Sequence, residues 1–303
     1  MGPTHPAGVL IGRTVTPAGT FGVVVSSTGT VFASVFSGSV IRGDVFTRTF
    51  PVSIPVTGSA YEVTLTADER FVLVGHQNSS AGPITIINAA TNATVTTVPT
   101  PGGVVSSARD QTGLRLFFGL VDTPNLIEVR VQADAGWSSR LIGLDAGVGF
   151  LSGAMNGLGY DPLRDTLYVT HTSGRLFTVP STGGTAFISP AIGTMRGAAF
   201  DARRDRFYAV DEMGAGVTRT TPLLAPVNQP PMIPTAWGAA LTPDAHELWV
   251  TNSNAGTLHI IDLIGTTGTR TVSGLGRPRK IAFEPSGRRA VIANENGEVL
   301  FFQ

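Results

Sequence analysis

Residues 237–263 read WGAALTPDAHELWVTNSNAGTLHIIDL, and this stretch decides the fold. A strand of small residues leads into the tight turn TPDA at 242–245. The second strand, at 247–251, carries Leu, Trp and Val, which suit a pleated and half-buried surface. The next five residues, NSNAG, are typical of a turn, and a third strand closes the stretch. The pattern therefore predicts a meander of three short strands.

The same pattern recurs along the chain, in good copies and in looser ones. Successive copies begin at about residues 21, 61, 105, 156, 196, 237 and 279. Their spacing of roughly 40 to 50 residues is the period of propeller blades. A single blade cannot bury both of its own faces, so the repeats predict one domain over residues 1–303.

The two ends of the chain predict how the ring closes. The last copy holds only three strands, whereas a blade of this type has four. Residues 8–16, GVLIGRTVT, form a lone strand ahead of the first copy. Pairing that strand with the last copy would remove two exposed sheet edges. We therefore expect an all-β, seven-bladed β-propeller of four-stranded blades, with the N-terminal strand completing the last blade.

Composition and charge limit the partners and the cellular location that we expect for this protein. The net charge is zero, charged residues make up 14% of the chain, and Lys280 is the only lysine, so no nucleic-acid partner is expected. No run approaches the ~20 apolar residues of a bilayer span. The start has no basic segment followed by an apolar core, so we expect no signal peptide and a cytoplasmic location. A periplasmic or other extracytoplasmic location is the alternative, if a leader was removed.

The repeats resemble the YVTN family of β-propeller repeats, a lactonase-like and NHL-like group. The family pattern is a Pro-Asp-Gly-type turn, a Leu-Tyr-Val-Thr-Asn strand and an Ile-Asp strand end. Thr242-Pro243-Asp244, the strand LWVTN at 248–252 and Ile261-Asp262 match it well. The strand LYVTH at 167–171 matches with His in place of Asn. The resemblance implies a propeller, and its members include lactonases, gluconolactonase-like hydrolases and noncatalytic binding proteins.

Two sets of polar residues are expected on one face of such a ring, at the start of each first strand and after each second strand. The resemblance to gluconolactonase-like hydrolases implies a site for one divalent cation, such as Ca²⁺ or Zn²⁺, bound through oxygen. In that interpretation His76 or His171 is the general base and Arg196 stabilises an oxyanion. The candidate metal ligands are Glu62, Asp211 and Asn252.

A structural interpretation explains the same residues separately. Asn252, Asn294 and Asp211 stand where turns favour short polar side chains that bond the local backbone. Glu62 and Lys280 are expected to face each other across the channel as an ion pair. With no catalytic motif in the sequence, we expect no enzymatic activity and no cofactor, and the hydrolase is the alternative.

The expected function is that of a rigid protein-binding scaffold or a structural subunit of a larger assembly. Residues 221–234, TPLLAPVNQPPMIP, are expected to form an apolar, proline-rich surface segment that contacts a partner, or equally an edge strand that its prolines protect. Residues 145–154 form an apolar, glycine-rich loop. A basic region in the last repeat is either a solvated rim of the last blade, which the pattern favours, or a surface for an acidic partner or anionic lipid headgroups. The candidate partner-binding residues are Leu223, Leu224, Pro230, Pro231, Met232, Arg277, Arg279, Lys280, Arg288 and Arg289.

Overall fold

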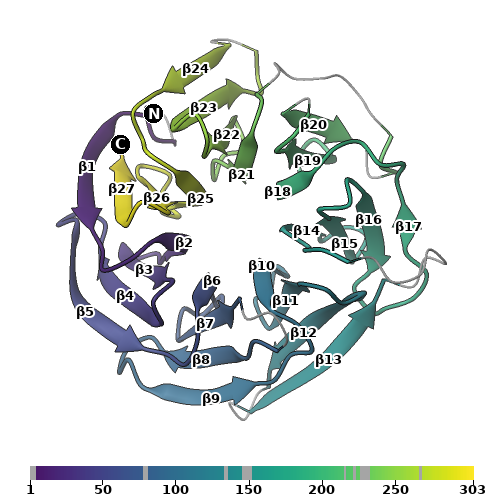
Figure 1. Cartoon of the computed structure of the whole chain (residues 1–303), viewed down its shortest axis with the longest axis horizontal. Helices are drawn as coiled ribbons and strands as arrows, with labels where there is room; N and C mark the ends of the chain where they lie inside the picture. The colour runs from purple at the N-terminus through teal and green to yellow at the C-terminus, as the bar shows by residue number, and fades with distance from the viewer. Residues whose placement is uncertain are drawn as a thin grey trace.

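The computed structural model of the chain describes residues 5–77, 81–132, 136–144, 152–214, 216–220, 223–225, 233–265 and 268–303. All regular structure in these ranges is β-strand. The sheets stand like blades around a common axis, with one strand of each sheet innermost (Figure 1). The protein is therefore a β-propeller.

The strands are given sheet by sheet, from the axis outward. The first three sheets are β2 (Thr20–Val25), β3 (Thr30–Val35), β4 (Ser39–Asp44) and β5 (Thr49–Pro55); β6 (Ala60–Leu65), β7 (Phe71–His76), β8 (Ile84–Asn88) and β9 (Thr94–Val98); and β10 (Val104–Arg109), β11 (Arg115–Leu120), β12 (Asn125–Val131) and β13 (Trp137–Gly143). The next three are β14 (Gly157–Asp161), β15 (Thr166–Thr170), β16 (Leu176–Pro180) and β17 (Phe187–Ile188); β18 (Met195–Asp201), β19 (Arg206–Asp211) and β20 (Val217–Thr220); and β21 (Ala236–Leu241), β22 (Glu247–Asn252), β23 (Thr257–Asp262) and β24 (Thr269–Val272). The last sheet is β25 (Pro278–Phe283), β26 (Ala290–Asn294), β27 (Glu298–Phe302) and β1 (Leu10–Val15).

The expectation of seven four-stranded blades needs a correction. Within the described residues, six sheets have four strands, and the repeat that begins near residue 196 forms a sheet of three, β18-β19-β20. The chain after β20 is rich in proline, which cannot donate to a sheet ladder. Residues 221, 222 and 226–232 of that segment lie outside the described ranges.

The predicted closure of the ring is confirmed. β1 pairs antiparallel with β27, and the register runs from Leu10 opposite Phe302 to Val15 opposite Glu298. Beyond the ladder, the backbones of Val9 and Gln303 exchange two hydrogen bonds of 2.9 Å. The two ends of the chain therefore lie side by side in one sheet (Figure 1).

The core consists of apolar side chains packed between neighbouring sheets. Trp249 of β22 is fully buried, and its ring meets Phe283 and Phe302 of the last sheet edge to face, with centroids 5.0 and 5.8 Å apart. The Trp249 indole nitrogen donates to Glu247 Oε2 at 2.9 Å, so its burial leaves no unpaired donor. Contacts of this kind join each blade to the next.

Small residues let the innermost strands of neighbouring sheets approach closely. A Cβ atom on Gly22 would lie 2.6 Å from the carbonyl oxygen of Tyr61 in the next sheet. Ser34 Oγ, on the second strand, donates to that same oxygen at 2.8 Å. An equivalent set is formed by Gly238, Thr251 and Arg279. These bridges set the spacing of the inner strands and hence the width of the channel.

Candidate functional site

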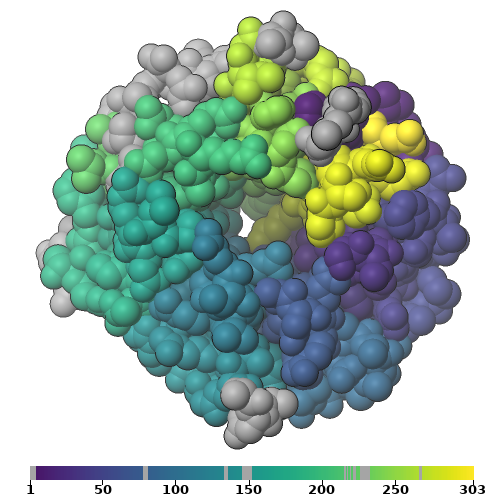
Figure 2. Space-filling view, turned by 180° about the vertical axis from the view of Figure 1, so that it is seen from behind, coloured from purple at the N-terminus to yellow at the C-terminus, as the bar shows by residue number. Residues whose placement is uncertain are grey.

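The innermost strands enclose a cavity of about 330 Å³ on the axis of the ring. A narrow opening at the centre of the disc is visible in the space-filling view (Figure 2). Each of the strands β2, β6, β10, β14, β18, β21 and β25 contributes lining residues. The polar ones are Glu62, Thr64, Ser106, Ser107, Arg109, Asn156, Arg196 and Lys280. We call the face of the ring on which these strands begin the mouth face.

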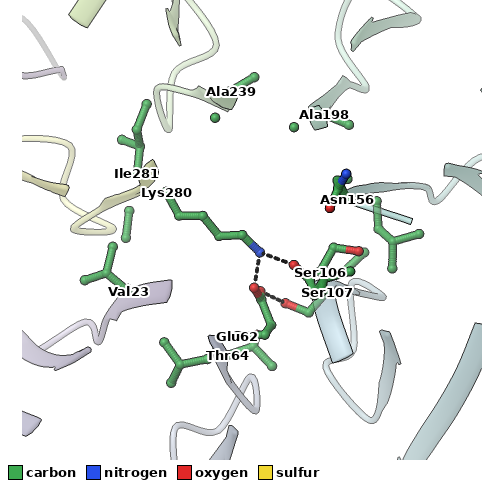
Figure 3. A pocket seen from close by; sticks show the side chains of 18 of the residues that line it. Val23, Glu62, Thr64, Ser106, Ser107, Asn156, Ala198, Ala239, Lys280 and Ile281 are labelled. Atoms are coloured by element: carbon green, nitrogen blue, oxygen red, sulfur yellow. Dashed lines mark hydrogen bonds and ion pairs between the residues drawn. The ribbon is translucent and has the colours of Figure 1, made fainter. Parts of the chain in front are cut away.

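Glu62 and Lys280 meet inside this cavity, as predicted. Lys280 Nζ forms an ion pair with Glu62 Oε2 and donates to the carbonyl oxygen of Val105 at 2.9 Å (Figure 3). Ser107 Oγ donates to the other carboxylate oxygen, Oε1, at 2.6 Å. Both carboxylate oxygens of Glu62 therefore have partners. Glu62 is only 4% exposed, so water has little access to this ion pair.

This pair gives a first testable expectation. Lys280→Met should destabilise the protein by about 2 kcal/mol, because it leaves the Glu62 carboxylate buried without its counter-charge. The double variant Glu62→Gln/Lys280→Met should recover most of that loss, since neither charge remains to be desolvated. Urea unfolding of the single and double variants measures the coupling. Additive losses in the double variant would show that the two side chains do not stabilise each other.

Five flat side chains form a stacked row at the mouth face, each from the start of an innermost strand. The rings of Tyr61 and Phe21 stack with centroids 4.7 Å apart. The Arg279 guanidinium carbon lies 5.6 Å from the Phe21 centroid and 3.6 Å from the Trp237 centroid. The Arg196 guanidinium carbon lies 4.2 Å from the Trp237 centroid on the far side of the row. Alternating rings and guanidinium groups are mutually attractive.

The charges of the stacked row are balanced by two acidic side chains. Arg196 Nε donates to Glu212 Oε2 at 2.6 Å, and Arg279 forms an ion pair with Glu295. Burial raises the pKa of Tyr61 to about 12, so its hydroxyl stays protonated at neutral pH. Sequence reasoning missed Glu212 and Glu295. The signal was present, because each follows the second strand of a repeat whose first strand carries arginine as its second residue.

The acidic and amide residues that end the second strands bond the local backbone. Asp211 Oδ1 accepts hydrogen bonds from the amides of Thr194 and Met213, both at 2.9 Å. Asn252 Oδ1 accepts from the Ala255 amide at 2.9 Å. Neither side chain lines the central cavity. Both residues therefore hold the turn that follows their strand.

The two candidate histidines lie in comparable surroundings. His76 Nε2 is 2.8 Å from Thr85 Oγ1, and His171 Nδ1 accepts from the Ser173 amide at 3.0 Å. Both rings are buried away from the cavity, and burial lowers the pKa of each. Neither imidazole lies where it could accept a proton from a molecule in the channel.

The structure thus divides the residues of the hydrolase interpretation. Glu62 and Arg196 line the central cavity, where each is held by an ion pair. The other members of the set do not line it: His76, His171, Asp211 and Asn252. A hydrolase of the expected kind needs the acidic ligands and a histidine around one pocket, and this chain does not place them so.

The apolar partner-binding candidates fall partly within the described ranges. Leu223 is 81% exposed, whereas Leu224 is buried against the core beside β18 and β19. Pro230, Pro231 and Met232 lie outside the described residues, as do residues 145–151 of the glycine-rich loop.

The basic candidates of the last repeat do not form one patch. Arg277 and Arg279 pair with Glu295 at the mouth face, and Lys280 points into the channel. Arg288 and Arg289 lie at the other end of β25, where the Arg289 guanidinium covers the ring of Phe46 at 5.3 Å. The blade separates the two groups, so a partner would meet only one of them at a time.

No protein-family model matches the chain, and no curated protein matches it. Within the described residues, the structure contains no helix with the length and apolar character that a bilayer crossing requires.

Proposed function

We propose that this β-propeller is a noncatalytic binding protein that presents its mouth face to a partner protein. One observation carries the proposal: the candidate histidines, Asp211 and Asn252 lie outside the channel and bond their own turns or a neighbouring strand. In the channel, Glu62 is paired with Lys280, and Arg196 is paired with Glu212. A rigid disc whose channel carboxylate and lysine are already paired with each other is suited to binding through its face. The YVTN-type resemblance, which includes noncatalytic binding proteins, is compatible with this proposal.

The mouth face carries residue types that dominate protein interfaces. Trp237 and Arg196 of the stacked row are half-buried there, and Trp, Tyr and Arg are the commonest anchors in protein–protein contacts. Next to them, Met213 is 77% exposed and Ile192 is 43% exposed. The two apolar side chains flank the Asp211 turn, because the segments 192–194 and 211–213 are joined through the Asp211 carboxylate and the Glu212 amide. A partner seated here would cover apolar, aromatic and cationic groups together.

Met213→Glu should weaken capture of the partner at least tenfold, because a carboxylate would be buried at the centre of the contact. Leu163→Glu is the matched control. Leu163 is 75% exposed in the turn between β14 and β15, at the end of these strands opposite the mouth face, and its change should leave capture intact. The measurement is a pull-down with the full chain from its native source, quantified by mass spectrometry.

Three results would overturn the proposal. The first is equal capture of the partner by the Met213→Glu and Leu163→Glu variants, and the second is no stoichiometric partner with the wild-type chain. The third is turnover of a lactone or sugar-acid lactone by the wild type that Glu62→Gln abolishes, which would establish the hydrolase instead. Thermal unfolding of each variant checks that the disc remains folded.

A further inference from the structure

Two histidines and an aspartate meet where the N-terminal segment crosses the β21–β22 turn. His5 Nδ1 lies 2.7 Å from Asp244 Oδ2, and His246 Nδ1 lies 3.4 Å from the same oxygen. One ligand atom from each of the three side chains falls within 4.8 Å of the other two. Imidazole nitrogens and a carboxylate at this spacing are the donor set of zinc sites with three protein ligands.

The turn itself prepares the carboxylate for this role. Asp244 Oδ1 accepts from Thr242 Oγ1 at 2.7 Å and from the His246 amide at 3.1 Å, which fixes the orientation of the side chain. Oδ2 is thereby directed toward both imidazoles. The Asp244 side chain is 11% exposed and that of His246 is 43% exposed, so an ion can reach the cluster from solvent.

A second carboxylate lies behind His5. Glu247 Oε1 is 3.6 Å from His5 Nε2, on the side of the ring away from Asp244. Glu247 is itself held by the Trp249 indole nitrogen at 2.9 Å and by Arg270. Metal-bound histidines generally direct their second ring nitrogen at such a carboxylate, which sets the tautomer and the ring orientation.

The second repeat shows the same turn without the metal-binding residues. There Thr66 Oγ1 donates to Asp68 Oδ1 at 2.6 Å, and the Arg70 amide donates to the same oxygen at 3.1 Å. Arg70 occupies the position of His246 and forms an ion pair with Asp68, 2.9 Å from Nε to Oδ2. These hydrogen bonds are therefore a shared feature of the repeats, whereas the two imidazoles distinguish the β21–β22 turn from the turn of the second repeat.

We propose that His5, Asp244 and His246 bind one Zn²⁺-class divalent cation that fastens the N-terminal segment to the β21–β24 sheet. β1 belongs to the neighbouring sheet, so the ion would connect two blades at the seam where the ring closes. Arg270 Nη1 already donates to the carbonyl oxygen of Ala7 at 2.6 Å along the same path. The ligands come from positions 239 residues apart in the chain, so the bound ion closes a very long loop.

The test uses the full, untagged chain with Zn²⁺ and with Co²⁺ as a spectroscopic probe. The wild type should bind one Co²⁺ per chain with visible absorption typical of a tetrahedral site. Zinc at about 100 times its dissociation constant should raise the melting temperature by roughly 5 °C, and EDTA should reverse the rise.

Variants locate the ion. His246→Arg copies the turn of the second repeat and should keep the metal-free melting temperature while losing the Co²⁺ spectrum and the zinc shift. His5→Ala should behave alike. His259→Ala, which changes a histidine on β23 that bonds Thr257 and Thr271, should retain both signals. Absence of stoichiometric Co²⁺ binding by the wild type, or binding that survives in the His5→Ala/His246→Arg double variant, would overturn the proposal.

Discussion

A chain shortened to begin at residue 17 is expected to lose its cooperative unfolding transition and to aggregate. The deletion removes β1, which covers the whole length of β27 from Glu298 to Phe302. It also removes Ile11, which packs against the core between the first and last sheets. The expected loss is about 5 kcal/mol or more, comparable with the entire stability of many domains. The uncovered β27 would be an open sheet edge, which promotes association between chains.

Circular dichroism during heating and light scattering after size exclusion measure this loss. A permuted chain supplies the control: it begins at residue 17 and carries residues 9–16 after Gln303 through a short turn. Leu10 lies opposite Phe302, so the moved strand can fold back onto β27 as a hairpin. The permuted chain should unfold like the wild type. A shortened chain that stays monomeric and melts at the wild-type temperature would show that β1 does not close the ring.

Glu128→Gln should destabilise the protein by about 3–5 kcal/mol, because it removes the one negative charge at the centre of three arginines. Glu128 is fully buried, and Arg115 Nε and Arg130 Nε each donate to its Oε1 at 2.7 Å. Arg140 pairs with its other oxygen. Arg115 also forms an ion pair with Asp165 of the next blade, 2.9 Å from Nη1 to Oδ1, so the network links two blades. Glu69→Gln, whose carboxylate bonds Ser27 at an exposed site, should cost less than about 1 kcal/mol.

The same network predicts a loss of stability in acid. Burial alone would raise the pKa of Glu128, but hydrogen bonds and charge from the arginines outweigh it and hold that pKa below its ordinary value. A depressed pKa stabilises the folded state at pH values above the unfolded pKa of about 4.3, and this contribution fades as pH falls below that value. Urea unfolding at pH 7 and pH 3 should therefore show a smaller pH dependence in Glu128→Gln. An equal dependence in both proteins would contradict this role.

The fold was largely predictable because the same pattern of short strands and tight turns recurs along the sequence. The alternation of small residues, tight turns and β-branched strands recurs often enough that noise in any single copy does not matter, and the unfinished last copy indicated the closing strand. The strand complement of the repeat near residue 196 was predicted wrongly. The signal was present in its proline-rich outer segment, because proline cannot donate to a ladder, but the repeat period alone predicts four strands.

The site was predictable only where it depends on position in the repeat. Glu62 and Lys280 occupy equivalent positions on innermost strands, so their pairing across the channel followed from the ring. The hydrolase set looked convergent because His76, His171, Asp211 and Asn252 also share a repeat position. At that position three of the side chains bond their own loop and His76 contacts Thr85 of the neighbouring strand, and repeat spacing does not report these directions. The contact between His5 and Asp244 depends on how the N-terminal segment crosses a neighbouring sheet, which no local pattern encodes.

Closure by β1 also determines how the disc responds to mechanical load. The start of β1 and the end of β27 lie at the same end of this strand pair, because Val9 and Gln303 bond each other. Tension applied through these two residues acts along the interstrand bonds, which run perpendicular to antiparallel strands, and breaks them one after another from that end. A pair loaded along its strands would instead resist with all its bonds at once. The seam is therefore the weak direction of the ring: force applied at Val9 and Gln303 separates β1 from β27 one bond at a time.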